Sequence, residues 1–385
     1  MKVIYYSKDF LADCDFPLVK ALQNKGIDVY YFIPLNRNFR KSVLFNFKEP
    51  FKKAKLIKAS NIKEMMTFRE CIDLDRLYFI SGYSGRIWWP FSWILWLRTM
   101  RLFKEINPDV IHLAYHLTSP FEKLIYRLPF KGKKIVTVHD PFIHSNKPNA
   151  KKIEQDRLKL FKWADRFILL NDIQSSEFAR HYEIPKSNIN ISHLGIYDTI
   201  TKITPKPTEI KDKYILFFGL MAHYKGLDIL LDAMKQVHKN APDLKLVIAG
   251  GGNLDFDISK YNNSEYIEWR HRYIPIDELA GLLQNAEFSV CPYRDATQSG
   301  VVQTSLSMRC PVLGTNVGAL STAIKDGITG RIIHPCDVDA LTDAILDWYN
   351  NPSYLEEIRE NIELVWKPSM SWDKIADSYI EIYKD

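Results

Sequence analysis

Short apolar runs alternate with amphipathic segments along the chain. The first apolar run, Met1–Tyr6, precedes a helical pattern over Phe16–Lys25 that Gly26 ends, and Ile27–Ile33 is the next apolar run. Apolar runs of this length predict buried strands, and a helical segment between two of them predicts a βαβ unit with a parallel sheet. The start of the chain therefore indicates an α/β domain.

The same rhythm continues along the rest of the chain. Further strands are predicted at Val110–Leu113, Lys134–His139, Arg166–Leu170, Tyr214–Phe218 and Leu244–Ala249. Between the halves, Thr199–Ile210 contains two prolines among threonines and lysines, which is typical of a linker. A last helix is predicted at Trp372–Tyr383. We therefore predict α/β domains at residues 1–198 and 213–368, a linker at 199–212 and a C-terminal helix within 369–385.

Length and composition support this organisation. The 385 residues fit two domains of about 190 residues each, and 46% hydrophobic with 25% charged residues is typical of a folded soluble protein. The five cysteines form no CxxC pair and no metal-ligand spacing, which favours a reducing compartment. Because the chain begins with a predicted strand rather than a signal peptide, we expect a cytoplasmic protein.

The net charge of +6 is unevenly distributed. Residues 1–195 contain 33 Lys and Arg against 19 Asp and Glu, a net charge of +14, whereas residues 196–385 contain 19 against 27, a net charge of −8. A basic half favours an anionic partner such as phospholipid, lipid-linked phosphate or nucleic acid, although a merely solvated basic face has the same composition. No recognisable nucleic-acid motif accompanies it, so we expect no nucleic acid partner.

Residues 83–101 contain four tryptophans between arginines. The uncharged run Ile87–Leu97 is shorter than the roughly 20 residues that span a bilayer, and Pro90 suits the first turn of a helix. The simpler interpretation is a core helix of the first domain. The alternative is peripheral contact with an anionic membrane through residues 83–101 and the basic domain, because Trp and Arg are favoured at a membrane interface.

Two loops bear on ligand binding. The loop after the first strand, Ser7–Asp13, contains no glycine, which argues against the GxGxxG fingerprint of a NAD enzyme. Farther along, the turn Thr297–Gly300 separates a predicted strand at Phe288–Cys291 from a helix predicted to start at Val301. Free backbone N–H groups at a helix N-terminus favour an anion, and the glycine allows its close approach. The turn is therefore a candidate anion site.

Several sequence blocks occur in one order between residues 214 and 335. They are FFGLMAHYKGLDILLDAM, VIAGGGN, RYIPIDELAGLLQNAEFSVCPYRDATQSGV, PVLGTNVGAL and DGITGRIIHP. This order resembles the C-terminal domain of the family 4 (group 1) glycosyltransferases, which have the GT-B fold. The first half is compatible with the same family through PDVIH, TVHDPFIHS and ISHLGIYD.

The resemblance implies a fold and a reaction. The GT-B fold has two Rossmann-like doubly wound domains facing a central cleft, here with the acceptor on residues 1–198, the nucleotide-sugar on 213–368, and the last helix crossing back to the first domain. The implied enzyme is a retaining glycosyltransferase that needs no cofactor or metal ion. It would move a sugar from a UDP- or GDP-linked donor to a lipid-linked saccharide or surface glycan in polysaccharide biosynthesis, at the inner face of the cell membrane.

The resemblance also implies a donor site. Lys225 matches the family lysine that contacts the diphosphate, and Ser299, Gly300 and Val301 match the loop whose backbone N–H groups bind phosphate. Positive charge fixed at these places would stabilise the leaving diphosphate. The other residues expected beside the donor are Gly219, Gly251, Arg272, Tyr273, Asp295 and Gln298.

In the first domain the resemblance singles out the end of one strand. His139 resembles the family histidine near the transferred sugar, and we predict it to be catalytic together with Lys225. Asp140 and His116 are predicted to lie on the acceptor side.

Two departures from the family pattern leave a second function open. Thr297 and Ser305 stand in place of the E-x7-E glutamates, and Leu220 and Ala222 stand where an arginine is usual. The chain resembles a subgroup that has the same T-Q-S-G turn and acts in surface-polysaccharide assembly. The alternative is a non-catalytic GT-B protein that binds carbohydrate or nucleotide within a glycan assembly complex.

Overall fold

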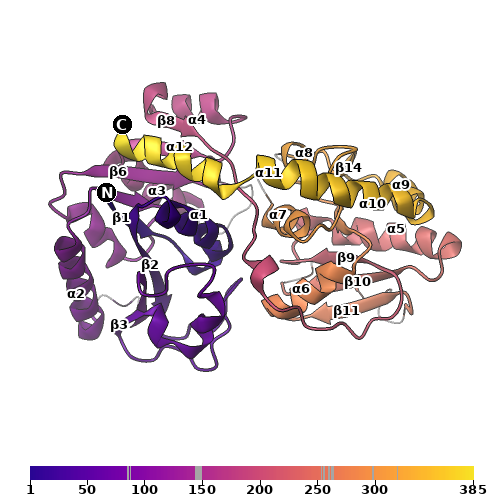
Figure 1. Ribbon diagram of the computed structural model, residues 1–385, viewed down its shortest axis with the longest axis horizontal. Coiled ribbons are helices and arrows are strands. Elements are labelled where there is room, and N and C mark those ends of the chain that lie inside the picture. The colour runs from indigo at the N-terminus through magenta and orange to yellow at the C-terminus, as the bar shows by residue number, and fades with distance from the viewer. Residues whose placement is uncertain are drawn as a thin grey trace. The chain divides into compact units, whose positions relative to one another are not determined.

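The computed structural model describes residues 1–84, 86, 88–143, 150–252, 254, 256–258, 261, 264–296, 299–318 and 320–385. The chain divides into two compact units (Figure 1). The first unit consists of Met1–Gly195 with Trp372–Asp385, and the second consists of Ile196–Ser371. The domain boundaries predicted at residues 198 and 369 fall near these divisions.

The first unit contains an eight-stranded sheet with the order β3-β4-β2-β1-β5-β6-β7-β8. All neighbouring strands are parallel except β3 and β4, which are antiparallel. The strands are β1 Lys2–Tyr6, β2 Asp28–Asn36, β3 Lys55–Lys58, β4 Leu77–Tyr83, β5 Val110–Leu113, β6 Lys133–Val138, β7 Arg166–Leu169 and β8 Ile189–Ile191.

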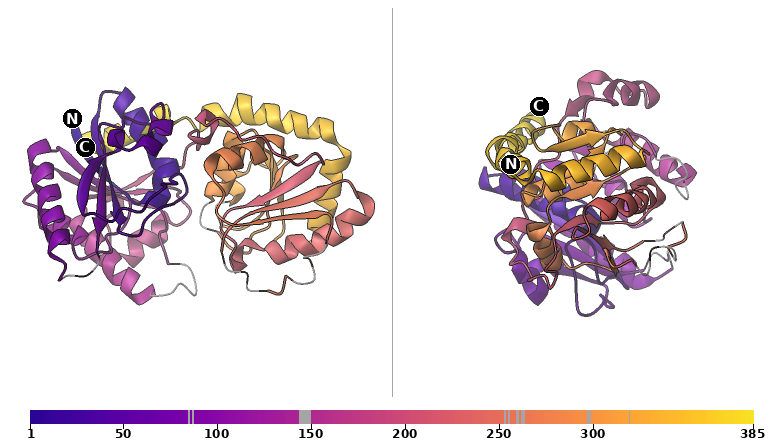
Figure 2. Two further views of the ribbon diagram at one scale, coloured as in Figure 1. Left: turned by 90° about the horizontal axis from the view of Figure 1, so that it is seen from below. Right: turned by 90° about the vertical axis from the view of Figure 1, so that its right-hand side faces the viewer.

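Helices cover both faces of this sheet (Figure 2). They are α1 Ala12–Asn24, α2 Pro90–Ile106, α3 Ala150–Trp163, α4 Ser175–His181 and α12 Trp372–Lys384. Ile4 and Tyr6 of β1 belong to the core beneath α2, α3 and α4, whereas Tyr5 between them donates a hydrogen bond to Asp15 of α1. The C-terminal helix α12 packs beside α1, and its Tyr383 hydroxyl lies 2.7 Å from Nδ1 of the buried His112.

The second unit contains a six-stranded sheet, entirely parallel, with the order β11-β10-β9-β12-β13-β14. The strands are β9 Tyr214–Phe218, β10 Lys245–Gly250, β11 Ile267–His271, β12 Ser289–Cys291, β13 Val312–Thr315 and β14 Gly330–Ile333. The helices are α5 Leu227–Asn240, α6 Ile276–Asn285, α7 Gly300–Ser307, α8 Leu320–Ala323, α9 Val338–Asn350, α10 Pro352–Asn361 and α11 Lys367–Ser369. Two cores, one with α5 and α9 and the other with α6, cover the opposite faces of the sheet. Both units are therefore doubly wound.

Residues 199–212, predicted to be a linker, pack on the second unit. Ile200 and Ile203 are buried, and the Lys206 N–H donates a 2.9 Å hydrogen bond to the Asp277 carbonyl at the start of α6. A Cβ on Gly281 of α6 would lie 1.9 Å from the Lys206 carbonyl oxygen, so only glycine lets this segment approach so closely.

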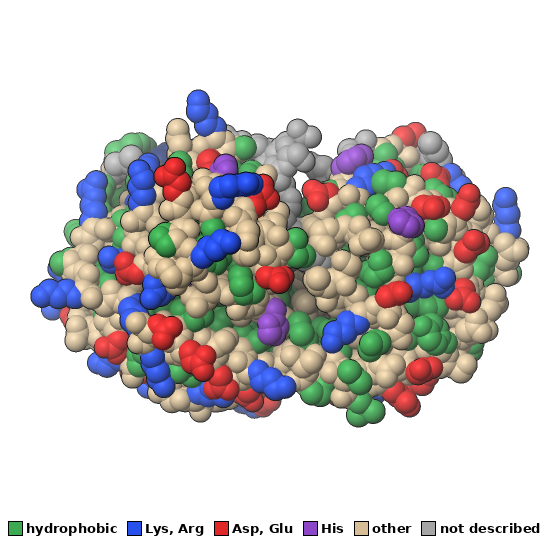
Figure 3. Space-filling model, turned by 90° about the horizontal axis from the view of Figure 1, so that it is seen from above, with side chains coloured by type: hydrophobic (Ala, Val, Ile, Leu, Met, Phe, Trp, Pro, Cys, Tyr) green, Lys and Arg blue, Asp and Glu red, His purple; other side chains and the backbone are tan. Residues whose placement is uncertain are grey.

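Within the described ranges, no helix is long and apolar enough to cross a membrane. Lys and Arg side chains are spread over the part of the surface formed by the first unit (Figure 3), in keeping with the charge of residues 1–195.

Candidate functional site

Glycines allow the loops at the carboxyl ends of β9 and β10 to meet. Gly219, directly after β9, has a φ of +106°, and its N–H donates to the Ala249 carbonyl at 3.0 Å. A Cβ on Gly250 would lie 1.9 Å from the Gly219 carbonyl oxygen, and one on Gly219 would lie 3.1 Å from Val301 Cγ2. These two loops and the first turn of α7 therefore meet at one edge of the sheet, where ligands bind in doubly wound folds.

Lys225 is a buried cation beside this edge. It ends the short 3-10 turn His223–Lys225, and its Nζ lies 3.8 Å from the centroid of the Tyr293 ring. No carboxylate among the described residues lies within 4 Å of its ammonium group. Burial lowers the pKa of Lys225 to about 8, because water no longer solvates the charge. The ring face stabilises the ammonium group only in part, which leaves the site favourable for an anion.

Tyr293 connects Lys225 to the N-terminus of α7. Its buried hydroxyl lies 3.3 Å from Ser299 Oγ, and Ser299 caps α7 by accepting a hydrogen bond from the Val302 N–H at 3.5 Å. The N–H groups of Gly300 and Val301 have no acceptor inside the helix, because they belong to its first turn. Tyr293 therefore connects the predicted Lys225 to the predicted phosphate loop. The sequence analysis did not identify this tyrosine.

An ion pair holds the Lys225 turn against the loop that contains Tyr293. Arg294 donates two hydrogen bonds to the Asp228 carboxylate, of 2.7 and 2.6 Å, and a third of 3.0 Å to the His223 carbonyl. Burial raises the pKa of Asp228, but the hydrogen bonds and charge of Arg294 outweigh it, so the pKa lies below its usual value. Gly226, with φ +66°, leaves no room for a Cβ, which would lie 2.0 Å from the Pro292 carbonyl oxygen.

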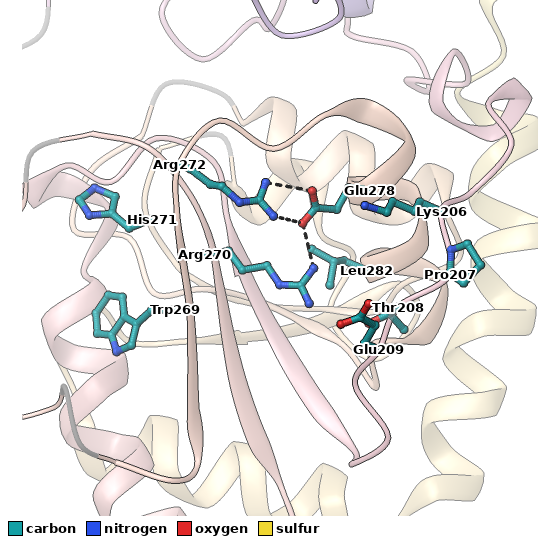
Figure 4. A pocket seen from close by; sticks show the side chains of 10 residues that line it. All are labelled: Lys206, Pro207, Thr208, Glu209, Trp269, Arg270, His271, Arg272, Glu278 and Leu282. Carbon is teal, nitrogen blue, oxygen red and sulfur yellow. Dashed lines mark hydrogen bonds and ion pairs between the residues drawn. The ribbon is translucent and has the colours of Figure 1, made fainter.

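Arg272 lines a pocket of about 540 Å³ at the edge of the same unit (Figure 4). Its guanidinium group donates hydrogen bonds of 2.9 and 2.6 Å to Glu278 of α6, and Arg270 donates another of 2.9 Å to the same carboxylate. The Arg272 side chain is therefore engaged with α6. Its backbone lies near Gly251, the other residue expected beside the donor at this edge, where a Cβ would be 3.9 Å from the Arg272 carbonyl carbon.

The remaining predicted donor residues lie in loops of the second unit. Tyr273 directly follows Arg272, and burial raises the pKa of its hydroxyl to about 12. Asp295 is exposed in the loop between β12 and α7. Gln298 lies outside the described residues, as does Thr297. Ser305, at the second E-x7-E position, is buried and accepts a hydrogen bond of 2.9 Å from the Ser289 hydroxyl, so this position has a packing role.

The predicted catalytic histidine and the two predicted acceptor-side residues lie together in the first unit. His116, His139 and Asp140 line one small pocket at the carboxyl ends of β5 and β6, with Tyr115 and Arg157. Arg157 donates a 2.6 Å hydrogen bond to the Asp140 carbonyl and so holds the loop after β6. The His116 ring lies 4.1 Å from the Tyr115 ring, measured between centroids.

His139 is a neutral hydrogen-bonding group in this pocket. Burial lowers its pKa to about 4, although the nearby Asp140 acts in the opposite direction. Its Nε2 is buried and has no hydrogen-bond partner in the part of the chain that the structure describes. A buried polar atom without a partner is costly, so this nitrogen is suited to a ligand hydroxyl.

Three Asp-x-Asp triplets, at residues 13–15, 73–75 and 337–339, have the spacing of a metal-dependent transferase motif, but their carboxylates have structural partners. Asp15 accepts hydrogen bonds from the Tyr5 and Tyr31 hydroxyls, and Asp337 caps α9 by accepting from the Ala340 N–H. Apart from the residues that could not be described, no group of three or more His, Cys, Asp or Glu side chains is placed to hold a metal ion.

Two family models match the chain. A model described as "Glycosyltransferase Family 4" matches residues 17–199, and one described as "Glycosyl transferases group 1" matches residues 212–351. Together these matches extend over both units.

Characterised relatives and a solved structure agree with these matches. Alpha-D-kanosaminyltransferase of Streptomyces kanamyceticus is 22% identical to this chain, over 80% of this chain and 85% of the relative. O-antigen chain mannosyltransferase C of Escherichia coli is also 22% identical, over 76% of this chain and 79% of the relative. Anabaena HepE, solved in complex with UDP-glucose, superposes with a TM-score of 0.68 at 12% identity, over 100% of this chain and 99% of that one. The similarity to HepE establishes the fold alone, and its GT-B architecture agrees with the two doubly wound units.

Proposed function

Because the chain belongs to the family 4 (group 1) glycosyltransferases, and is therefore a transferase enzyme that uses nucleotide-sugar donors, we propose a specific reaction for it. It moves a sugar from a UDP- or GDP-linked donor to a lipid-linked saccharide or surface glycan. The transfer retains the anomeric configuration and requires no metal ion. The second unit binds the donor, and the first unit binds the acceptor.

The observation that carries this proposal is the buried Lys225 ammonium group. It has no carboxylate partner among the described residues, and Tyr293 joins it to the cap of α7. A donor diphosphate would supply the missing negative charge, with its oxygens between Lys225 and the first-turn N–H groups of α7. These groups are fixed before the reaction, so they stabilise the charge that develops on the leaving diphosphate without reorganising.

In the proposed mechanism the leaving phosphate accepts the proton, His139 forms a hydrogen bond to the sugar, and Lys225 with α7 stabilises the negative charge. As the bond from the anomeric carbon to the diphosphate oxygen breaks, the acceptor hydroxyl forms a new bond on the same face, and its proton passes to the departing phosphate. Neutral His139 accepts or donates a hydrogen bond at a sugar hydroxyl, since its pKa of about 4 keeps it uncharged near pH 7. Lys225 and α7 supply the positive charge that a metal ion supplies in other transferases.

The proposed acceptor class rests on two observations. The Escherichia coli relative acts, by its name, on an O-antigen chain, and residues 1–195 of this protein are strongly basic. A basic surface favours an acceptor that carries a lipid-linked phosphate. We place the reaction at the inner face of the cell membrane on the same grounds.

The alternative function is that of a non-catalytic partner in a glycan assembly complex. It is favoured by Ser305, which has a packing role where the family has a glutamate. The retained Lys225 and α7 cap argue for donor binding in both cases, so only turnover separates the two.

The experiment is a transfer assay in the presence of EDTA. Purified protein is incubated with UDP- and GDP-sugars and with lipid-linked acceptors, and release of UDP or GDP is followed together with the glycosylated product. Release that depends on an acceptor supports the proposal. Tight nucleotide binding without turnover on any acceptor supports the non-catalytic alternative.

A further inference from the structure

Helix α2 has one apolar face inside the protein. Leu95, Trp96, Met100 and Phe103 are buried in the core of the first unit, against β4 and its neighbours. This face accounts for the core helix that the sequence predicts. It does not account for the apolar residues on the other side of the helix.

The opposite face of α2 is also apolar over its first two turns. Phe91, Ile94 and Leu97 are 57%, 47% and 61% exposed, and they follow one another at helical spacing. Trp93 beside them is also exposed, and Trp88, just before the helix, is 68% exposed. Five large apolar side chains therefore form one exposed patch, which we call the α2 patch: Trp88, Phe91, Trp93, Ile94 and Leu97. A contiguous patch of this kind marks an interaction surface.

Basic side chains surround the α2 patch. Arg98, Arg101 and Lys104 are exposed on the later turns of the same helix, and Arg101 pairs with an acid, Glu105, at 2.9 Å, whereas the other two have no acidic partner among the described residues. At the other end, the exposed Arg86 guanidinium lies 5.3 Å from the Trp88 ring centroid.

The neighbouring loop adds to this charge. The guanidinium of Arg37 lies 5.2 Å from the centroid of the Trp89 ring, which places the loop after β2 beside the start of α2. Cations at both ends of an apolar patch complement a surface that has negative charge outside and hydrocarbon beneath.

We propose that the α2 patch docks the protein on an anionic lipid bilayer. The 17 residues of α2 are fewer than the roughly 20 needed to span a bilayer, and one face of the helix is occupied by the protein core. The helix therefore lies along the membrane, with the aromatic and aliphatic side chains among the upper acyl chains and the arginines at the phosphate headgroups.

The charge of the chain favours this orientation. Residues 1–195 carry a net charge of +14 and residues 196–385 a net charge of −8, so an anionic surface attracts the unit that contains α2 and repels the other. The proposal rests on α2 and its surroundings, and it does not depend on the proposed transfer reaction.

Vesicle flotation tests the proposal on the full-length protein. We expect the protein to float with vesicles of phosphatidylcholine and phosphatidylglycerol at low salt, and to float less with phosphatidylcholine alone or at 0.5 M salt. The double variant F91S/L97S should bind the anionic vesicles about tenfold more weakly, because two apolar anchors are lost. The double variant R98Q/R101Q should bind the anionic vesicles at least about tenfold more weakly and depend less on anionic lipid, because two of the cations beside the patch are lost.

Ile173→Ser is the matched control, because Ile173 is an equally exposed apolar residue of the same unit outside the α2 patch. It should float like the wild type. Circular dichroism melting and nucleotide binding are measured on every variant, which separates a loss of fold or of donor binding from a loss of membrane binding. Absence of flotation by the wild type at low salt would overturn the proposal. So would a wild-type dimer, seen by light scattering, that F91S/L97S converts to a monomer without any change in flotation.

Discussion

The Nζ of Lys225 lies 3.8 Å from the centre of the Tyr293 ring, and the hydroxyl of that ring lies 3.3 Å from Ser299 Oγ. The three residues come from two loops and the cap of a helix. Their arrangement places a buried cation beside the positive end of α7, and this positive region is the basis of the proposed donor site.

Donor binding should depend on pH through Lys225. The pKa of Lys225 is lowered by burial to about 8, so the ammonium form is present below this pH and is lost above it. We expect the affinity for UDP or GDP to fall above pH 8, by up to about tenfold per pH unit. Calorimetric titrations between pH 6.5 and 9.5 measure this. An affinity that stays constant up to pH 9.5 would contradict the assignment.

The lowered pKa of Lys225 also predicts how the free energy of unfolding changes with pH. An unfolded lysine has its pKa near 10.5, so between pH 8 and 10.5 the unfolded chain binds a proton that the folded chain does not. The contribution of Lys225 to the free energy of unfolding therefore increases with pH across this window. Denaturant titrations of the wild type and of Lys225→Met should show this increase in the wild type alone.

Gly226→Ala should destabilise the second unit. The new Cβ would lie 2.0 Å from the Pro292 carbonyl oxygen, and the residue would keep an unfavourable φ of +66°. Gly327→Ala is the control, since Gly327 has a φ of +72° but meets only the Tyr354 hydroxyl, at 3.8 Å. We expect a loss of about 1 kcal/mol for Gly327→Ala and a loss larger by at least ~1 kcal/mol for Gly226→Ala. Equal melting temperatures would show that the close approach to Pro292 is not required.

Arg294→Lys should weaken donor binding without touching the donor. Lysine cannot reproduce the two hydrogen bonds to Asp228 and the third to the His223 carbonyl, so the Lys225 turn loses its anchor. We expect a loss of about 1–3 kcal/mol in the free energy of unfolding and a higher donor Kd. The control is Arg331→Lys, at an exposed pair with Asp347, where the loss should be below about 1 kcal/mol. Similar losses in both variants would contradict the anchoring role.

His139→Ala should lower turnover and leave nucleotide binding unchanged. In the proposed mechanism His139 forms a hydrogen bond to a sugar hydroxyl and does not contact the nucleotide, so its loss should affect turnover alone. We expect kcat to fall by about 100-fold. Because its pKa lies near 4, the wild-type rate should show no histidine inflection between pH 5.5 and 7.5. The exposed His181→Ala variant is the control and should retain full activity.

The buried strands could be predicted from the sequence because helices cover both faces of a parallel sheet, so its strands are apolar along their whole length. Tyr214–Phe218 is a continuous apolar run and Val110–Leu113 is apolar except for His112, and the structure gives these strands the same bounds. The edge strand β11 is half-buried and mixes apolar with charged residues, so no such run marked it. The α2 helix was ambiguous for a physical reason: its sequence is apolar on both faces, and only one of them is buried.

The residues of the candidate site were harder to predict from the sequence than the strands. Lys225 and His139 were identified by resemblance to the family, and no local pattern marks them, whereas Ser299 lies in the turn Thr297–Gly300 that the local pattern already predicted as an anion site. Tyr293 and Arg294 were missed because Lys225 and Asp228, with which they interact, are distant in sequence: Arg294 pairs with Asp228 across 66 positions. An aromatic residue and an arginine directly after the predicted strand Phe288–Cys291 were the available signal.

The most direct test asks whether the buried Lys225 ammonium group binds the donor diphosphate. The wild type and Lys225→Ala are titrated with UDP, GDP and their sugar conjugates in the presence of EDTA. Lys235→Ala, which removes an exposed lysine paired with Asp232, is the control. We predict that one nucleotide class binds the wild type and the control equally. Lys225→Ala should bind it much more weakly, with turnover lower by about 100-fold or more. Unchanged binding and turnover in folded Lys225→Ala protein would contradict the account, because the buried ammonium group would then not contact the donor.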